Sequence, residues 1–101
     1  MAMKRFITLL SFTPQGRNTI QESPARADAF IAAATVAGCK VNALYWTVGG
    51  YDGLISFDAP DEETATALMV KLSSAGNVTT HTLQAFPREG IERILAKAGG
   101  L

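Results

Sequence analysis

Two residues in this sequence are of types that commonly transfer protons, and they lie far apart along the chain. Histidine exchanges a proton readily near neutral pH, so His81, the only histidine, is the natural candidate for a general base. Asp52 follows Tyr51 in the glycine-rich stretch 49–53, and the two can form an acid–base or substrate-anchoring pair. Aspartate and glycine are also ordinary hairpin-turn residues, and single strand histidines are usually solvated or hydrogen-bonded. We favour these structural interpretations for both residues.

A second group of residues is suited to binding an anion rather than to catalysis. Arg26 lies near Glu22 and Gln15 around the predicted start of a helix. Backbone amides and a guanidinium at such a position can hold a negatively charged ligand. A local salt bridge, worth at most about 1 kcal/mol, explains the same residues equally well. Arg26 and Gln15 are therefore candidate ligand-binding residues.

Three neighbouring residues of a predicted strand are candidates for lining a ligand cavity. Tyr45 and Trp46 point to opposite faces of that strand, because side chains alternate along an extended chain. Large aromatic residues usually fill a core or a dimer contact, so we expect packing to be their main role. Thr47 can face a polar cavity or simply reflect the preference of threonine for strands.

The sequence offers little to hold a metal or a cofactor. Cys39 is the only cysteine, which excludes an internal disulfide and a cysteine-rich metal site. No spacing of carboxylates around His81 completes a transition-metal site. The glycines at 49, 50 and 53 precede a strand, whereas a nucleotide-binding glycine loop opens a helix. We therefore expect no metal and no cofactor.

The composition indicates one soluble domain. A chain of 101 residues has room for a single core, so we assign residues 1–101 to one domain. Nine basic and nine acidic residues give zero formal charge, and the absence of a basic stripe argues against a nucleic-acid partner. No run approaches the roughly 20 apolar residues of a membrane span, so we expect a cytoplasmic protein that does not bind membranes. Charged residues make up 18%, below the usual share of about 25%, which favours self-association.

Residue patterns predict the elements that must position these candidates. Alternating apolar and β-branched residues predict strands, and they occupy Phe6–Phe12, Val41–Val48, Leu54–Asp58 and Val78–Phe86. Thr13–Gly16 resembles a turn. One helix is expected from a cap at Ser23 to a stop at Gly38, a second from a cap at Asp61 to Gly76, and a short third after Pro87.

The resulting order is β-α-β-β-α-β, the ferredoxin-like arrangement of class α+β with a four-stranded antiparallel sheet and an extra C-terminal helix. Two helices cover only one face of such a sheet. The strands at Phe6–Phe12 and Val41–Val48 nevertheless carry apolar residues on both faces. A partner's sheet packed against the open face would bury them, and a two-fold homodimer is the commonest solution. The alternative is that loops and the C-terminal helix fold over that face.

An ordered set of short motifs resembles the GYD-domain family, which is named for its Gly-Tyr-Asp tripeptide. The motifs are Thr13-Pro14-Gln15-Gly16, Glu22-Ser23-Pro24-Ala25-Arg26-Ala27, Tyr45-Trp46-Thr47, Gly50-Tyr51-Asp52, Ala59-Pro60-Asp61 and Gly76-Asn77-Val78, with further matches to Phe86. The resemblance implies a dimeric α/β-barrel assembly but no particular substrate. It departs at Thr79 and His81, where charged residues are common in the family, so no role is assigned to a charge on that strand.

Three functional hypotheses follow. The first is a dimeric module that binds a small, partly apolar ligand. The second is a small cofactor-free enzyme, similar to the oxygenases and isomerases among dimeric α/β-barrel proteins, with His81 or Asp52 as the base. The third is a purely structural oligomer without a cavity. The side chains that line the largest cavity distinguish these three.

Overall fold

A computed structural model describes residues 2–101 of the chain, and its elements follow the predicted order. They are β1 (Lys4–Phe12), α1 (Pro14–Asn18), the 3₁₀ helix η1 (Ile20–Glu22), α2 (Ser23–Val36), β2 (Lys40–Trp46), β3 (Gly53–Ala59), α3 (Glu62–Ser74), β4 (Val78–Ala85) and α4 (Arg88–Gly99). None of the helices in residues 2–101 is long and apolar enough to cross a membrane. The predicted α+β class and βαββαβ order are confirmed.

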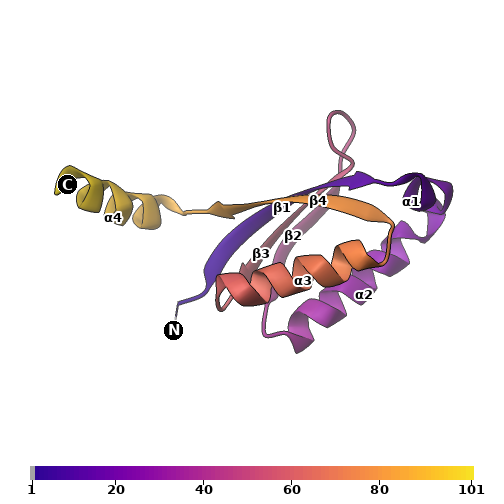
Figure 1. Ribbon diagram of the computed structural model, residues 1–101, viewed down its shortest axis with the longest axis horizontal. Coiled ribbons are helices and arrows are strands. Elements are labelled where there is room, and N and C mark those ends of the chain that lie inside the picture. The colour runs from indigo at the N-terminus through magenta and orange to yellow at the C-terminus, as the bar shows by residue number, and fades with distance from the viewer. Residues whose placement is uncertain (1) are drawn as a thin grey trace.

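The four strands form one antiparallel sheet in the order β2-β3-β1-β4. The register of β1 against β3 pairs Phe6 with Phe57 and Leu9 with Leu54, and β4 places His81 opposite Leu9. Helices α2 and α3 lie side by side on one face of this sheet (Figure 1). We call this the covered face, and we call the opposite one, which carries Leu9, Leu54 and His81, the open face.

The core fills the space between the covered face and the two helices. Phe6 and Phe57 stack with their ring centroids 5.6 Å apart, and Phe57 is fully buried. Phe30 from α2 and Leu68 from α3 close the cluster from the other side. The buried Thr8 hydroxyl accepts a 3.0 Å hydrogen bond from Thr82 Oγ1 of the neighbouring strand, so this buried polar group has a partner.

The first helical segment was predicted as a turn, and that prediction is wrong. Thr13 Oγ1 accepts a 3.1 Å hydrogen bond from the Gly16 amide and so caps the short helix α1, with Pro14 at its first position. A Thr-Pro pair carries the same signal that a Ser-Pro pair does at a helix start. The two pairs lie ten residues apart, and both belong to helices.

The predicted cap at Ser23 is also wrong, although the helix itself is present. Ser23 already has helical backbone angles, because η1 runs directly into α2 and leaves no extended residue to act as a cap. Its hydroxyl instead accepts a 3.0 Å hydrogen bond from Trp46 Nε1. The stop at Gly38 is confirmed by its φ of +81°, a conformation that glycine adopts without strain.

Helix α3 begins and ends as the sequence predicts. Asp61 caps it by accepting a 2.7 Å hydrogen bond from the Thr64 amide, and that bond holds the pKa of Asp61 below its usual value. Gly76 follows the helix with a φ of +83°.

Strand β2 contains a β-bulge that regular alternation did not predict. Val41 pairs with Phe57 and Ala43 pairs with the next residue of β3, Ser56, so Asn42 is the extra residue. Val41 therefore packs against the core, whereas Ala43 and Tyr45 lie on the open face. Strict alternation would place Val41, Ala43 and Tyr45 on one face, and the bulge separates Val41 from the other two. The strand also ends at Trp46, two residues before the predicted end.

Helix α4 follows Pro87 as predicted, but it lies beyond the end of the sheet (Figure 1). It does not fold over the open face. Its larger apolar residues, Ile91, Ile94 and Leu95, are all exposed.

Candidate functional site

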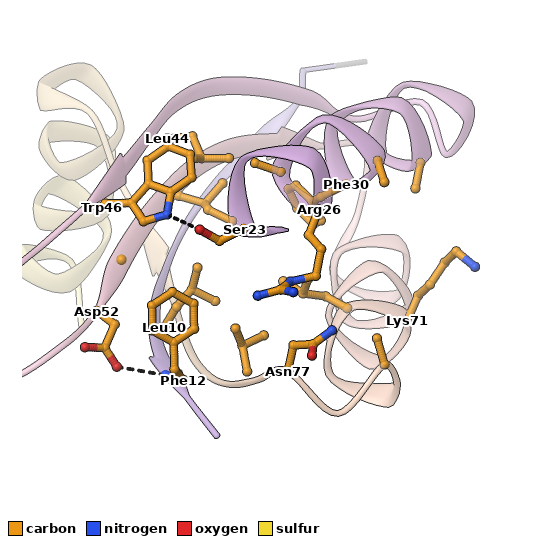
Figure 2. Close-up of a pocket in the computed structure, with 18 of the residues that line it drawn as sticks. Leu10, Phe12, Ser23, Arg26, Phe30, Leu44, Trp46, Asp52, Lys71 and Asn77 are labelled. Carbon is orange, nitrogen blue, oxygen red and sulfur yellow. Dashed lines mark hydrogen bonds between the residues drawn. The ribbon is translucent and has the colours of Figure 1, made fainter. Parts of the chain in front are cut away.

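A cavity of about 350 Å³ lies between the covered face and helices α2 and α3 (Figure 2). Its walls are mainly apolar and include Leu10, Phe12, Phe30, Leu44, Ile55 and Leu72. The strand residues reach it because alternation directs them toward the helices. Ala27 and Ala33 line it from α2, and their small side chains leave the space that larger residues would fill.

One end of the cavity is closed by a contact between β2 and α2. Trp46 contributes its indole ring, and its Nε1 atom donates a 3.0 Å hydrogen bond to the buried Ser23 hydroxyl. Trp46 is half exposed, so the ring has one side toward the cavity region and one toward solvent. The predicted division of Tyr45 and Trp46 between two faces of the strand agrees with this placement, since Tyr45 pairs with Leu54 on the open face.

Arg26 is the main charged group of the cavity wall (Figure 2). Its Nη1 atom donates to Thr19 O and Thr19 Oγ1 at 3.2 and 3.1 Å, and its Nη2 atom donates to Gly16 O at 3.4 Å. These acceptors are neutral, and together they fix the end of α1 against α2. Gln15, which was predicted to lie near Arg26, makes its hydrogen bonds to other residues. It donates 3.1 Å hydrogen bonds to Ala75 O and Asn77 Oδ1.

Gly16 explains why α1 lies so close to the start of β4. A Cβ atom at Gly16 would lie 2.0 Å from the backbone oxygen of Asn77, a distance that no side chain tolerates. The close approach brings Asn77 into the cavity wall opposite Arg26 (Figure 2). Sequence reasoning did not identify Asn77 as a site residue, because its role depends on this contact between segments 61 residues apart in the sequence.

Asp52 lies at the cavity edge with its carboxylate already engaged. Oδ2 accepts a 2.8 Å hydrogen bond from the Phe12 amide and lies 3.4 Å from Arg17 Nη2. The Asp52 amide donates to Leu10 O at 2.7 Å, and Thr47 Oγ1 donates to Tyr51 O at 2.6 Å. The Gly-Tyr-Asp turn is thus tied to the end of β1 by side-chain and backbone bonds together.

His81 and Tyr51 lie together, away from the cavity. His81 projects from the open face opposite Leu9, and its ring meets that of Tyr51 edge to face with centroids 5.8 Å apart. Neither residue lines the cavity, whereas Asp52 does. The structure therefore does not bring the two candidate bases, His81 and Asp52, to one site.

Other reactive groups are accounted for by packing. Burial raises the pKa of the Cys39 thiol, with a smaller contribution from Asp61, so the reactive thiolate is disfavoured. Within residues 2–101, no three histidine, cysteine or carboxylate side chains come close enough to hold a metal ion.

Comparison with known proteins assigns this architecture to a family. The family model described as GYD domain matches residues 6–95, which is most of the chain. The chain belongs to the GYD-domain family. A relative from Thermus thermophilus, named "Glutamine synthetase and cystathionine beta-lyase binding protein", is 34% identical over 86 residues, covering 84% of this chain and 90% of that relative.

Solved structures with the same fold come from more distant proteins. The leucine response regulatory protein LrpA of Mycobacterium tuberculosis superposes with a TM-score of 0.62 at 14% identity, covering 83% of this chain and 51% of that one. MtbAldR gives 0.61 at 17% identity, with coverages of 86% and 55%. This GYD-domain chain thus spans about half the length of both. The C-terminal domain of MgtC from M. tuberculosis gives 0.53 at 10% identity, with coverages of 82% and 87%. These similarities concern the ferredoxin-like fold alone.

Proposed function

We propose that this GYD-domain chain is a dimeric binding module that holds a compact, partly apolar ligand in the cavity between its sheet and helices. The cavity itself carries the proposal. Its volume of about 350 Å³ lies at the lower end of the range of about 300–1,000 Å³ for small-molecule sites. Mostly apolar walls with a few polar groups, here Arg26, Ser23 and Asn77, are typical of such sites.

The alternative of a cofactor-free enzyme has less support. A general base must reach the proton that it removes, within hydrogen-bond distance of a bound substrate. His81 projects from the open face, and the Asp52 carboxylate is bonded to the Phe12 amide and Arg17. The purely structural oligomer predicts no cavity, and the cavity therefore favours the binding module over it.

A thermal-shift screen with compact, partly apolar compounds tests this proposal. A ligand at a hundredfold excess over its Kd stabilises the folded state by about 2.7 kcal/mol, which is a readily measured increase in Tm. Ala27→Leu should abolish the increase, because Ala27 lines the cavity and a larger side chain would occupy it. Ala32→Leu is the matched control, since Ala32 lies on the same helix but is exposed. A hit that Ala27→Leu and Ala32→Leu bind equally well would place the ligand elsewhere, and a screen without hits would remove the support for the module.

The homodimer rests on the apolar residues of the open face. A row of paired residues crosses the whole sheet in the order Tyr45, Leu54, Leu9 and His81. Tyr45 is 61% exposed, and Leu83, also on this face, is 56% exposed. Contiguous exposed apolar residues usually mark an interaction site, and a second sheet packed face to face would cover them. Light scattering at micromolar concentration should give twice the mass of the chain; the mass of a single chain would refute the dimer.

The Thermus relative supports a second candidate, association with other proteins. That relative's name states that it binds glutamine synthetase and cystathionine beta-lyase, and 90% of its length matches this chain at 34% identity. We propose that this chain likewise binds metabolic enzymes of its own organism. Sedimentation velocity of this chain mixed with purified glutamine synthetase or cystathionine beta-lyase tests this proposal. A faster-sedimenting complex supports it, and unchanged sedimentation boundaries with both enzymes contradict it.

A further inference from the structure

We infer that the cavity selects a small hydrophobic carboxylate, with the carboxylate at Arg26 and Asn77 and the apolar body against Leu10, Leu44 and Leu72. This inference rests on the proposed function, and it adds the chemical class of the ligand. The arguments concern the charge of Arg26, its free hydrogen-bond donors and the composition of the opposite wall.

Arg26 is a partly buried cation that forms no ion pair with a carboxylate of residues 2–101. The ion pairs among residues 2–101 use Lys4, Arg5, Arg17 and Arg88, and none of them includes Arg26. Its acceptors, Thr19 and Gly16, contribute neutral oxygens only. A cation withdrawn from water is stabilised most by an anion, so an incoming carboxylate would gain a strong interaction here.

The hydrogen bonds of Arg26 leave donors for such a ligand. A guanidinium has five N–H groups, and the three hydrogen bonds of Arg26 use Nη1 and Nη2. The Nε group makes no hydrogen bond within residues 2–101, and Nη2 has a second N–H. Arg5 binds the Asp58 carboxylate through the same pair of atoms, with Nε–Oδ1 and Nη2–Oδ2 distances of 2.9 and 3.3 Å. The chain itself thus contains an example of the two-point contact that we infer at Arg26.

The surroundings of Arg26 favour one negative charge on the ligand. The guanidinium extends into the cavity toward the Asn77 amide (Figure 2). Among residues 2–101, Asp52 is the one carboxylate that lines the cavity, and Arg17 already offsets its charge. Lys71 also belongs to the wall, although its amine points outward (Figure 2). The cavity therefore has an excess of positive charge at the Arg26 end.

The apolar wall away from Arg26 determines the chemical character of the rest of the ligand. Leu10, Leu44 and Ile55 of the sheet and Leu72 of α3 face the same space without a polar group among them. A branched aliphatic or phenyl group fits these walls, whereas a sugar or a nucleotide would leave its polar groups unpaired there. The limited volume excludes long acyl chains.

Matched acids and amides test the inference directly. Trp46 is the only tryptophan and lines the cavity, so its fluorescence reports on binding. Titration with 3-phenylpropionate and with 4-methylpentanoate should give a Kd about tenfold or more below that of the corresponding amide, because charged hydrogen bonds are lost in the amide. Arg26→Gln should bring acid and amide to the same Kd, while Arg26→Lys should retain part of the preference.

Controls separate the role of Arg26 from its support of α1. Arg93→Gln removes an exposed arginine of α4 and should leave the acid preference unchanged. Because Arg26→Gln also removes bonds to Thr19 and Gly16, circular dichroism must show that the variant is folded. If Arg26→Gln is not folded, two other results still test the inference. They are the lower Kd of acids than of amides in the unmodified chain, and the loss of acid binding in Ala27→Leu.

Each outcome has a definite meaning. Equal Kd values for acids and amides in the unmodified chain would overturn the carboxylate class and leave the binding module standing. Inorganic phosphate that binds as tightly as the acids would overturn the role of the apolar wall. The absence of any fluorescence change with acids and amides alike, together with a thermal-shift screen without hits, would overturn both this inference and the proposed function.

Discussion

The two faces of the sheet differ in how their apolar residues are buried. On the covered face, Phe6, Ile55 and Phe57 are at most 6% exposed, because α2 and α3 pack over them. On the open face, Tyr45 and Leu83 remain more than half exposed, and they lie on the two edge strands, β2 and β4. The covered face is completed within the chain, whereas the open face has apolar residues that no helix of residues 2–101 covers, beside the Arg5–Asp58 ion pair. We therefore expect the covered face to contribute most of the folding stability, and the proposed association to use the open face.

The largest expected effect tests the covered face. Phe57→Ala removes a fully buried ring that stacks on Phe6, and it should lower the free energy of unfolding by about 3–5 kcal/mol. Urea unfolding followed by circular dichroism measures this loss. Tyr45→Ala on the open face is the control, and its smaller effect should depend on protein concentration because it acts through the dimer. Equal, concentration-independent losses for both variants would contradict the distinction between the faces.

The next effect concerns the rim of the covered face. Gly16→Ala would place a methyl group against the backbone oxygen of Asn77, so α1 must move, at a cost of about 1–3 kcal/mol in the free energy of unfolding. Gly50→Ala is the matched control in the hairpin turn, where an added Cβ meets no atom within 4 Å. Thermal unfolding should show a lower Tm for Gly16→Ala only. An unchanged Tm in that variant would mean that the α1–β4 contact is not held in solution.

A charge in the middle of the open face tests association without disturbing the core. Leu9→Lys introduces a cation beside Leu54 and opposite His81. In a face-to-face dimer this charge is buried without a partner, so the dissociation constant should increase about tenfold or more. Sedimentation equilibrium measures it. Ser73→Lys on the exposed side of α3 should not change it, and equal dimer strength in Leu9→Lys would place the interface elsewhere.

The smallest expected effect is a loss of thermal stability at acid pH, caused by an ion pair on the open face. The hydrogen bond from Arg5 lowers the pKa of Asp58, which lies opposite it on β3. Because the folded-state pKa is below the ordinary value, this pair stabilises the fold above about pH 4, and the contribution is lost as the pH falls through the lowered pKa. Asp58→Asn should therefore show a shallower decrease in Tm between about pH 4 and pH 2 than the unmodified chain. Asp28→Asn, which removes an exposed aspartate of α2, is the control and should follow the unmodified chain.

The elements that local patterns encode were predictable from the sequence. Gly38 and Gly76 end helices and Asp61 caps one because each acts on backbone groups within a few residues. The missed features have two different causes, one local and one between strands. The cap at Ser23 failed because η1 precedes it, and the bulge in β2 follows from the pairing of Val41 with Phe57 across strands.

The candidate site was predictable only in part, because much of it depends on contacts between residues far apart in the sequence. Arg26 and Trp46 were identified from their residue types and spacing, and both line the cavity. The cavity itself depends on the small residues Ala27 and Ala33 facing the sheet, and small residues in a helix carry no distinctive local signal. Asn77 enters the wall only through its contact with Gly16. His81 was singled out for its chemistry, but its position opposite Leu9 is a matter of strand register.

The central position of β1 has a consequence for synthesis of the chain. This strand is the first of the four to leave the ribosome, but the residues that pair with it are synthesised much later. Phe6 pairs with Phe57 and with Gln84. Pairings between residues so distant in the sequence slow folding, because the long chain segment between them must close first. Until β3 emerges, β1 has apolar residues on both sides and two unpaired edges, and one edge stays unpaired until β4 follows, which exposes the chain to aggregation. We therefore expect the nascent chain to need protection against aggregation from the time that β1 emerges until β4 emerges.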